Sequence, residues 1–252
     1  MQKISVTIIT YNEEKNIRRC LESVKAIADE IIVIDSLSTD STKAICETFG
    51  VTFIEQEFLG YIEQKNFAIQ KANYDFILSI DADEALDKTL QQSILQIKQQ
   101  GLQSDSYKMN RCTNFCGKWI KHGTWYPDRK VRLFNKHKTK WAGVNPHDTT
   151  ESLPNTTQQF LQGDILHYSY NTLEEVIAQA NKFTSIQAEA MYAQGKRASS
   201  INLFINPAVA FINGYILKAG FLDGFDGYIL AKTIAYQTMM KYAKLLHLQK
   251  KS

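Results

Sequence analysis

Four apolar runs rich in β-branched residues occur in the first hundred residues, and a helical pattern follows each of them. The runs are SVTIIT (5–10), EIIVID (30–35), VTFIEQ (51–56) and DFILSI (75–80). After the first run, apolar residues recur at helical spacing through Ile17, Leu21 and Val24, with Asn12 as the expected N-cap. Apolar strands that alternate with helices are typical of a parallel sheet buried on both faces. The sequence therefore predicts a doubly wound α/β domain.

Size and charge exclude several classes of protein. With 252 residues, 44% of them hydrophobic, the chain is long enough to bury a core and fold alone. Its net charge of +3 and the lack of a DNA- or RNA-binding motif argue against a nucleic-acid partner. The first residues form a strand pattern and not a secretory signal, and the four cysteines lack the pattern of a disulfide framework. We expect a reduced, cytoplasmic protein.

Polar residues follow the predicted strands at the points where the strands end. They are Thr10, Tyr11, Asn12 and Glu13 after the first, Asp35, Ser36 and Ser38 after the second, and Asp81 and Asp83 after the fourth. In a parallel sheet these points lie at one edge, which is where ligands bind. The sequence contains neither a G-x-G-x-x-G after the first strand nor a P-loop, which argues against dinucleotide binding and P-loop chemistry.

Asp81 and Asp83 are separated by a single small residue. A turn beginning at Ala82 would direct the two carboxylates toward different parts of one ligand. Carboxylate oxygens suit Mg²⁺ or Mn²⁺, and a site with few protein ligands suits a cation that substrate phosphates also bind. An equally open interpretation is an acidic turn before a helix. Glu84 and Asp87 would then lie at the N-terminus of that helix and interact favourably with its dipole.

Four segments, in their order and spacing, resemble family 2 bacterial glycosyltransferases with the GT-A fold: VTIITYNEE, IIVIDSLSTDST, GYIEQKNFAI and FILSIDADE. This resemblance covers residues 1–90. The later segments YPDRKVRLF, GVNPHD, LHYSY and FLDGFDGY look like the β-1,4-glucosyltransferase subgroup that adds glucose to the heptose of the lipopolysaccharide inner core. The resemblance implies a GT-A domain over 1–170, with a nucleotide-sugar-binding half (1–100) and an acceptor half (101–170).

The resemblance assigns roles to the residues after the first two strands. Thr10, Tyr11 and Glu13 would frame the nucleotide, and Asp35 would contact the uracil. The chemistry agrees, because N3–H of uracil donates a hydrogen bond and a carboxylate accepts one. Leu37 stands where the family usually has glycine, so we expect a different loop shape there.

The resemblance also assigns the diphosphate, the metal and the catalytic base. Lys65 would approach the base and diphosphate, Asp81 the ribose, and Asp83 the Mg²⁺ or Mn²⁺ ion. An inverting transfer needs a base that takes the proton of the acceptor hydroxyl. NPHD (145–148) occupies the position of the family's His–Glu motif, so Asp148 is the implied base.

Other interpretations of the second half stay open. Asp148 could instead be a turn residue after Pro146, and three further acids occur there: Asp128, Glu151 and Asp164. We interpret His167 as a hydrogen-bonded structural residue at a strand end, with metal binding as the alternative.

The last eighty residues are predicted to be helical. Thr172 and Glu175 match a capping box. The stretch 201–222 is long and apolar, but its asparagines, Pro207 and Lys218 argue against a membrane-spanning helix. An interfacial segment on the anionic inner leaflet and a helical pair packed on the domain or on a second subunit are both open. We treat 171–252 as a helical C-terminal region.

Together these observations predict an inverting, metal-dependent hexosyltransferase that uses a UDP-sugar, with UDP-glucose favoured, and a lipid-linked lipopolysaccharide-core acceptor. It would act in the cytoplasm, or peripherally at the cytoplasmic face of the inner membrane. Transfer to a polyprenyl phosphate is the close alternative. A nucleotidyltransferase would need a glycine-rich basic loop near the first strand, which TYNEEKN does not offer. A non-catalytic nucleotide-sugar binding module is the third alternative.

Overall fold

The computed structural model describes residues 2–145 and 147–251 and divides into two compact units. The first unit comprises Met1–Arg111 and Asp128–Tyr168, and the second comprises Cys112–Pro127 and Ser169–Ser252. The excursion Cys112–Pro127 therefore groups with the C-terminal helices. The sequence pattern, with its single boundary after residue 170, does not anticipate this grouping.

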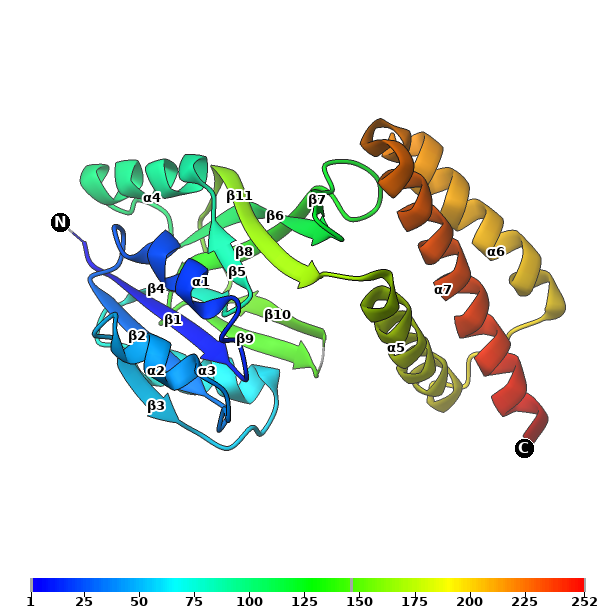
Figure 1. Cartoon of the computed structure of the whole chain (residues 1–252), viewed down its shortest axis with the longest axis horizontal. Helices are drawn as coiled ribbons and strands as arrows, with labels where there is room; N and C mark the ends of the chain where they lie inside the picture. Colours follow the sequence, from blue (N-terminus) through cyan, green and yellow to red (C-terminus); the bar gives the residue numbers. More distant parts are fainter. Residues whose placement is uncertain (1, 146, 252) are drawn as a thin grey trace. The chain divides into compact units, whose positions relative to one another are not determined.

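A mixed sheet forms the first unit, with strand order β3-β2-β1-β4-β8-β6-β11-β5 (Figure 1). The first four are parallel: β3 (Thr52–Glu55), β2 (Glu30–Asp35), β1 (Ile4–Thr10) and β4 (Phe76–Asp81). The other four are β8 (Asp128–Asn135), β6 (Ser106–Phe115), β11 (Gln158–Tyr170) and β5 (Glu84–Leu86). The pairs β4–β8, β8–β6 and β11–β5 are antiparallel. The predicted α/β class and its parallel half are confirmed, and the antiparallel half completes the sheet.

Three helices connect the parallel strands: α1 (Ile17–Val24), α2 (Thr42–Glu47) and α3 (Tyr61–Lys71). A fourth, α4 (Lys88–Gln100), links β5 to β6. The short β7 (Lys118–Trp119) pairs with β6, and β9 (Thr139–Val144) forms a separate hairpin with β10 (His147–Ser152). This hairpin matters for the site because Asp148 belongs to it.

Apolar side chains fill both faces of the parallel strands. Val33 and Leu78 point into the cluster that holds α1 and α4, whereas Ile32, Ile34 and Ile77 point into the cluster that holds α3. Successive side chains of a strand face opposite sides, so only continuous apolar runs can supply both clusters. The strands are thereby fixed in register, and their carboxyl ends are aligned at one edge.

Asn12 does not cap the first helix as the sequence predicted. Helix α1 begins at Ile17, and Asn12 adopts a left-handed conformation with φ of 53°. Its side-chain oxygen accepts a hydrogen bond from the Thr39 amide (2.8 Å), while the Ser38 hydroxyl accepts one from the Asn12 amide (2.8 Å). The loops after β1 and β2 are thus joined, because each residue satisfies the other loop's backbone.

The second unit contains three long helices: α5 (Leu173–Ala193), α6 (Ser200–Ile212) and α7 (Gly224–Lys251). A π-helical turn (η1, Asn213–Leu217) and a 3₁₀ turn (η2, Gly220–Asp223) join the last two. Thr172 caps α5 as predicted, since its hydroxyl accepts a hydrogen bond from the Glu175 amide. Phe115, Ile120, Val176 and Leu230 form the buried core of this unit.

The FLDGFDGY segment has a clear structural role. The buried carboxylate of Asp223 accepts hydrogen bonds from the amides of Lys121 (3.1 Å) and His122 (2.8 Å), and its other oxygen lies 3.0 Å from Nδ1 of His122. A Cβ atom on Gly227 would lie 2.0 Å from the Gly220 carbonyl oxygen, so only glycine fits this close approach. The motif therefore holds the loop at 121–122 against the start of α7.

Candidate functional site

The strand ends bring the predicted polar residues to one edge of the sheet. In the parallel register, Thr10 pairs with Asp35, and Ile9, its chain neighbour, pairs with Asp81. The backbones of the three polar residues therefore lie next to one another at the carboxyl ends of β2, β1 and β4. This is the edge at which open α/β sheets bind ligands.

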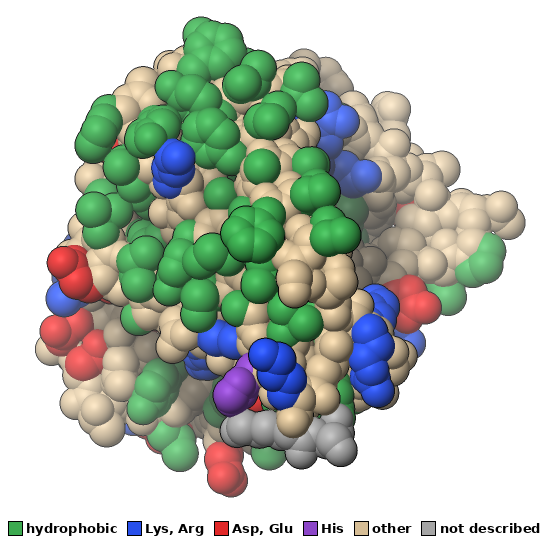
Figure 2. Space-filling model, turned by 90° about the vertical axis from the view of Figure 1, so that its right-hand side faces the viewer, with side chains coloured by type: hydrophobic (Ala, Val, Ile, Leu, Met, Phe, Trp, Pro, Cys, Tyr) green, Lys and Arg blue, Asp and Glu red, His purple; other side chains and the backbone are tan. Residues whose placement is uncertain are grey.

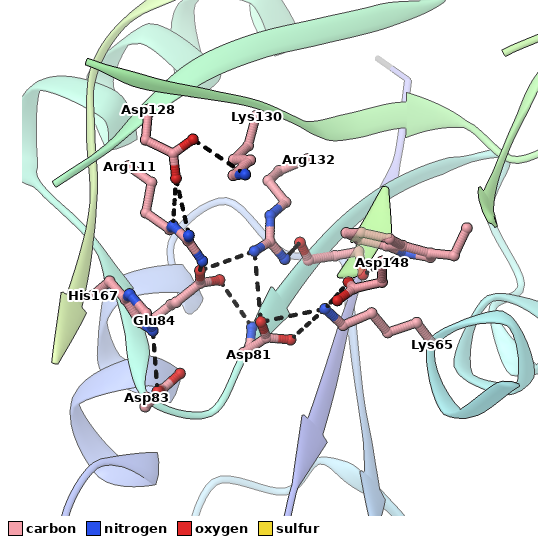
Figure 3. A network of polar contacts seen from close by, with 12 residues as sticks. Lys65, Asp81, Asp83, Glu84, Arg111, Asp128, Lys130, Arg132, Asp148 and His167 are labelled. Carbon is pink, nitrogen blue, oxygen red and sulfur yellow. Dashed lines mark hydrogen bonds and ion pairs between the residues drawn. The ribbon is translucent and has the colours of Figure 1, made fainter. Parts of the chain in front are cut away.

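Lys65 of α3 is buried and belongs to a charged cluster (Figure 3). Its Nζ lies 3.0 Å from Oδ1 of Asp81 and 2.7 Å from Oδ2 of Asp148. The same atom lies 4.3 Å from the ring centroid of Trp141, an arrangement that stabilises an ammonium group. Burial alone would raise the pKa of Asp81, but the charges of Lys65 and Arg132 outweigh it and hold the pKa well below its usual range.

Asp83 lies two residues after Asp81 in the chain, and its carboxylate faces a histidine. Its Oδ2 lies 3.2 Å from Nε2 of His167, a β11 residue whose register partner is Glu84 (Figure 3). Adjacent ligands of an octahedral ion with bonds of about 2.1 Å are about 3.0 Å apart, so this separation fits two ligands of one cation. Among the described residues, no group of three or more His, Cys, Asp or Glu side chains could hold a metal. Such an ion would need further ligands from a substrate or water.

Glu84 and Arg132 are residues of the cluster that the sequence interpretation missed. Glu84 is buried, and its Oε1 lies 2.9 Å from Nη2 of Arg132, which is also buried. Its other oxygen accepts a hydrogen bond from the Asp81 amide (3.0 Å). The role suggested for Glu84 at a helix terminus is therefore wrong, because Glu84 belongs to β5. A detectable signal was Arg132 itself, a charge between the apolar Val131 and Leu133 of β8.

The loop after β2 is held by Asp35. This carboxylate is almost fully buried and accepts hydrogen bonds from the amide (2.7 Å) and the hydroxyl (2.5 Å) of Ser38. Leu37, between them, has a φ of 63°. Leucine here adopts the left-handed conformation, which glycine takes without strain.

Three predicted nucleotide-binding residues follow β1. The Thr10 hydroxyl is buried and has no hydrogen-bond partner among the described residues, which marks it as available to a ligand. Tyr11 is exposed beside it. Burial raises the pKa of Glu13; a hydrogen bond from Asn16 lowers it in part, and the charge of Asp83 raises it further. Glu13 therefore lies close enough to Asp83, the candidate metal ligand, for the two carboxylates to repel each other.

The structure separates the four acids of the second half. Asp148 lies in the cluster, and Asp128 borders it through Arg111, whose Nη2 lies 2.9 Å away. Glu151 is three residues from Asp148 on β10, so it faces the opposite side, where it is exposed and near Lys140. Asp164 is buried on β11, and its carbonyl accepts a hydrogen bond from the Asp87 amide. The side chain of His147 lies outside the described residues.

Comparison with protein families and curated sequences gives a consistent result. The model of the family described as glycosyl transferase family 2 matches residues 5–154. An uncharacterized glycosyltransferase of Rickettsia typhi is 35% identical over 262 residues, covering 100% of this chain and 89% of the relative. The lipopolysaccharide core biosynthesis glycosyltransferase LpsC of Rhizobium meliloti is 26% identical, covering 96% of this chain and 91% of LpsC.

Solved structures show a weaker likeness. S. aureus TarS matches with a TM-score of 0.46 and 16% identity, over 99% of this chain and 92% of that one. Glucosyl-3-phosphoglycerate synthase of Mycobacterium tuberculosis, in complex with Mn²⁺, UDP and its product, matches with a TM-score of 0.37 and 21% identity, over 45% of this chain and 44% of that one. At these scores the likeness carries no inference about ligands.

Proposed function

The chain belongs to glycosyl transferase family 2, and we propose that it is an inverting transferase that moves a hexose, glucose first among the candidates, from a UDP-sugar to the heptose of a lipopolysaccharide core. The observation that carries this proposal is the buried cluster in which Lys65 contacts both Asp81 and Asp148. The name and coverage of LpsC support the choice of acceptor. The GT-A fold of the first unit supplies the sheet edge that presents the cluster.

The donor would lie along the carboxyl ends of β1, β2 and β4. Asp35 would accept the N3–H of uracil, and Tyr11 and Glu13 would frame the nucleotide. The Thr10 hydroxyl, which has no hydrogen-bond partner among the described residues, would form a hydrogen bond with the nucleotide. Asp81 would bind the ribose. Each role needs a hydrogen-bonding group at the sheet edge, which is where these residues lie.

Charge argues for a divalent cation with the donor. Lys65 offsets the charges of Asp81 and Asp148, and Arg132 offsets that of Glu84. Asp83 faces the imidazole of His167, so this carboxylate would contact a cation that an anionic diphosphate also binds. Asp83 and His167 would hold Mg²⁺ or Mn²⁺, and the imidazole nitrogen favours Mn²⁺. When bound, the ion would offset the charge that develops on the leaving diphosphate.

Asp148 would serve as the base. Its carboxylate would accept the proton of the acceptor hydroxyl as that oxygen attacks the anomeric carbon from the side opposite the diphosphate. Lys65 holds Asp148 by its Oδ2 atom and so fixes the direction of the carboxylate. The pairing of Lys65 with both carboxylates would keep the base and the donor-binding aspartate in one arrangement.

We assign the transferase domain to residues 1–170 and a location at the cytoplasmic face of the inner membrane, where a lipid-linked acceptor would be reached. The helical region 171–252 would then serve attachment rather than chemistry.

Release of UDP tests the proposal directly. The protein is incubated with UDP-glucose and Mn²⁺, with and without a heptose-terminated core oligosaccharide, and both UDP and the glycosylated product are measured. We expect UDP release that depends on the acceptor and matches the product. Tight UDP binding without turnover on any acceptor would identify a binding module, turnover only with polyprenyl phosphate would change the acceptor, and pyrophosphate release would identify a nucleotidyltransferase.

A further inference from the structure

The segment from α6 to the start of α7 presents a continuous apolar surface. Within the described part of the chain, α6 has no fully buried side chain. The most exposed large apolar residues of this segment are Ile201, Phe204, Leu217, Leu222 and Phe225, with exposures from 61% to 76%. Figure 2 shows hydrophobic side chains gathered on this face. We call these five residues the apolar face.

This surface is unusual for a helix in water. Residues 198–217 contain no charged side chain, and Ser200–Leu217 is long and apolar enough to cross a membrane by length and composition alone. Three asparagines and Pro207 occur within it, and the chain turns back at Gly220 into α7. A polar interruption every few residues suits a helix that lies in a membrane surface better than one that crosses it.

Charge around the apolar face is positive. From residue 190 to the end, the acids are Asp223 and Asp226. Asp223 is bonded to His122, and Asp226 lies 3.5 Å from Nζ of Lys118, so neither carboxylate opposes an anionic partner. The lysines of the same stretch include Lys218, directly after the uncharged run.

Aromatic rings and a lysine adjoin the apolar face. The ring of Tyr215 lies 5.3 Å from that of Phe211, 5.7 Å from that of Tyr228 and 6.3 Å from that of Phe221, measured between centroids. The Phe211 and Tyr228 centroids are 5.9 Å apart. Nζ of Lys232 lies 4.8 Å from the Phe211 ring and 5.5 Å from the Tyr228 ring. Tyrosine rings and lysines whose stems lie along apolar surface are enriched at membrane interfaces, because both have an apolar body and a polar tip.

We propose that residues 200–228 bind in the plane of an anionic phospholipid surface, with the apolar face in the acyl boundary and Lys218 and Lys232 at the headgroups. Of the candidate occupants, a lipid surface accounts for both features, because it combines an apolar layer with negative charge directly above it. Residues 190–252 carry eight Lys or Arg side chains against two Asp, so a second copy of this region would bring like charges together. The inference rests on this surface alone and holds whichever sugar the active site transfers.

Vesicle flotation tests the proposal with the full chain. We expect the protein to float with phosphatidylcholine vesicles that contain phosphatidylglycerol, to bind pure phosphatidylcholine less, and to be released by added salt. Phe204→Ser combined with Phe225→Ser should lower the partition coefficient at least about tenfold, since two large apolar side chains are lost from the inserted face. Lys218→Gln should lower it about fivefold, and only on the anionic vesicles.

A matched control distinguishes insertion of the apolar face from nonspecific adsorption of the protein to vesicles. Leu217→Ser removes a leucine of the apolar face, and Leu153→Ser removes a similarly exposed leucine of the first unit. Only the former should weaken flotation, while UDP affinity and the thermal unfolding profile stay unchanged in both. Equal flotation of all variants would overturn the proposal. So would a wild-type protein that ignores vesicles and sediments as a dimer which Phe204→Ser dissociates, because a second copy would then cover the face.

Discussion

Nζ of Lys65 lies 2.7 Å from Oδ2 of Asp148, although the two residues are 83 positions apart in the chain. Lys65 comes from α3, and Asp148 comes from the β9–β10 hairpin. Since Lys65 also contacts Asp81 at the end of β4, one buried ammonium ties the hairpin to the carboxyl edge of the sheet. The cluster therefore has a structural role, and tests of catalysis need a measure of stability beside them.

Asp81→Asn should destabilise the protein in a pH-dependent way. The folded-state pKa of Asp81 is held below that of an unfolded aspartate, about 3.9, so its stabilisation is complete above that value and is lost as pH falls toward the folded pKa. We expect the free energy of unfolding to fall by about 1–3 kcal/mol at pH 7. This is less than for a fully buried pair, because Lys65 would still be paired with Asp148 and Arg132 with Glu84. Urea unfolding between about pH 5 and pH 2 should show wild type and variant converging.

The control for that measurement is Asp75→Asn, which alters a largely exposed carboxylate near His137. Its effect should stay within about 0.5 kcal/mol at every pH. A constant gap between wild type and Asp81→Asn across the acid range would show that the ion pair does not set the pKa of Asp81.

Asp83→Asn and His167→Gln should each weaken the Mn²⁺ dependence of UDP binding. Both side chains are partly exposed and lie on the surface of the first unit, so the fold should be kept. The loss of one of two protein ligands should weaken Mn²⁺-dependent UDP affinity roughly 10–100-fold, by analogy with the effect of altering a metal's supporting residues. Calorimetric titration of UDP with and without Mn²⁺ measures this. Asp128→Asn is the control and should keep the dependence; a His167→Gln variant that also keeps it would remove His167 from the metal site.

Asp35 should make the protein prefer uridine over cytidine. Opposite N3 of cytosine, which carries no proton, the carboxylate would place one acceptor against another. An unpaired buried polar group costs about 1–3 kcal/mol, which corresponds to roughly five- to more than a hundredfold in affinity. Titration with UDP and CDP measures the ratio. Asp35→Asn should narrow the ratio of UDP affinity to CDP affinity. Equal affinities in the wild type would refute the assignment.

Hydrophobic periodicity was enough to predict the parallel strands and their helices. It works there because each strand must supply apolar side chains to both faces, a demand that leaves a continuous run in the sequence. The same logic placed Thr10, Asp35 and Asp81 at one edge. The antiparallel half was less predictable, since its strands are partly exposed and carry mixed patterns, as in SYKMNRCTNF of β6.

Contacts distant in sequence were not predictable from pattern. Arg132 and Glu84 lie 48 positions apart, and the residues around each of them do not indicate that the two side chains form an ion pair. Asn12 has the composition of an N-cap, but a cross-loop bond to Thr39 competes for its side chain and wins. At Leu37 the sequence did not indicate the left-handed backbone, which accompanies the hydrogen bonds between Asp35 and Ser38 on either side of it.

Leu37→Gly should stabilise the protein. A leucine at φ of 63° destabilises the folded state by roughly 1–2 kcal/mol, and glycine would remove this strain. Glycine also makes the unfolded chain more flexible, which cancels about 0.4–1 kcal/mol of the improvement. The expected net gain is up to about 1 kcal/mol. Leu59→Gly is the matched control, because Leu59 is similarly exposed and has a negative φ; it should lose stability. Urea unfolding that moves both variants in the same direction would contradict the idea that Leu37 is strained.

Asp148→Asn tests the residue on which the proposed mechanism most depends. Asparagine keeps the size and shape of the side chain but cannot take a proton at neutral pH, so a true base should lose turnover by about 10²–10⁴. UDP affinity should barely change, because the proposed mechanism has Asp148 contact the acceptor hydroxyl and not UDP. A purely structural Asp148 would instead show a small loss of turnover together with a lower unfolding temperature, since Lys65 would lose one of its two carboxylates.

The comparison variants decide which acid is the base. Asp128→Asn removes a carboxylate paired with Arg111 at the border of the cluster, and Glu151→Gln removes an exposed one on the opposite face of β10. We expect Glu151→Gln to turn over normally and Asp128→Asn to lose far less than Asp148→Asn, with turnover, UDP affinity and unfolding measured for all three under the same conditions. If Asp148→Asn turns over normally while Asp128→Asn fails with UDP binding intact, the base is Asp128, and the role of Asp148 is to hold Lys65 against the sheet.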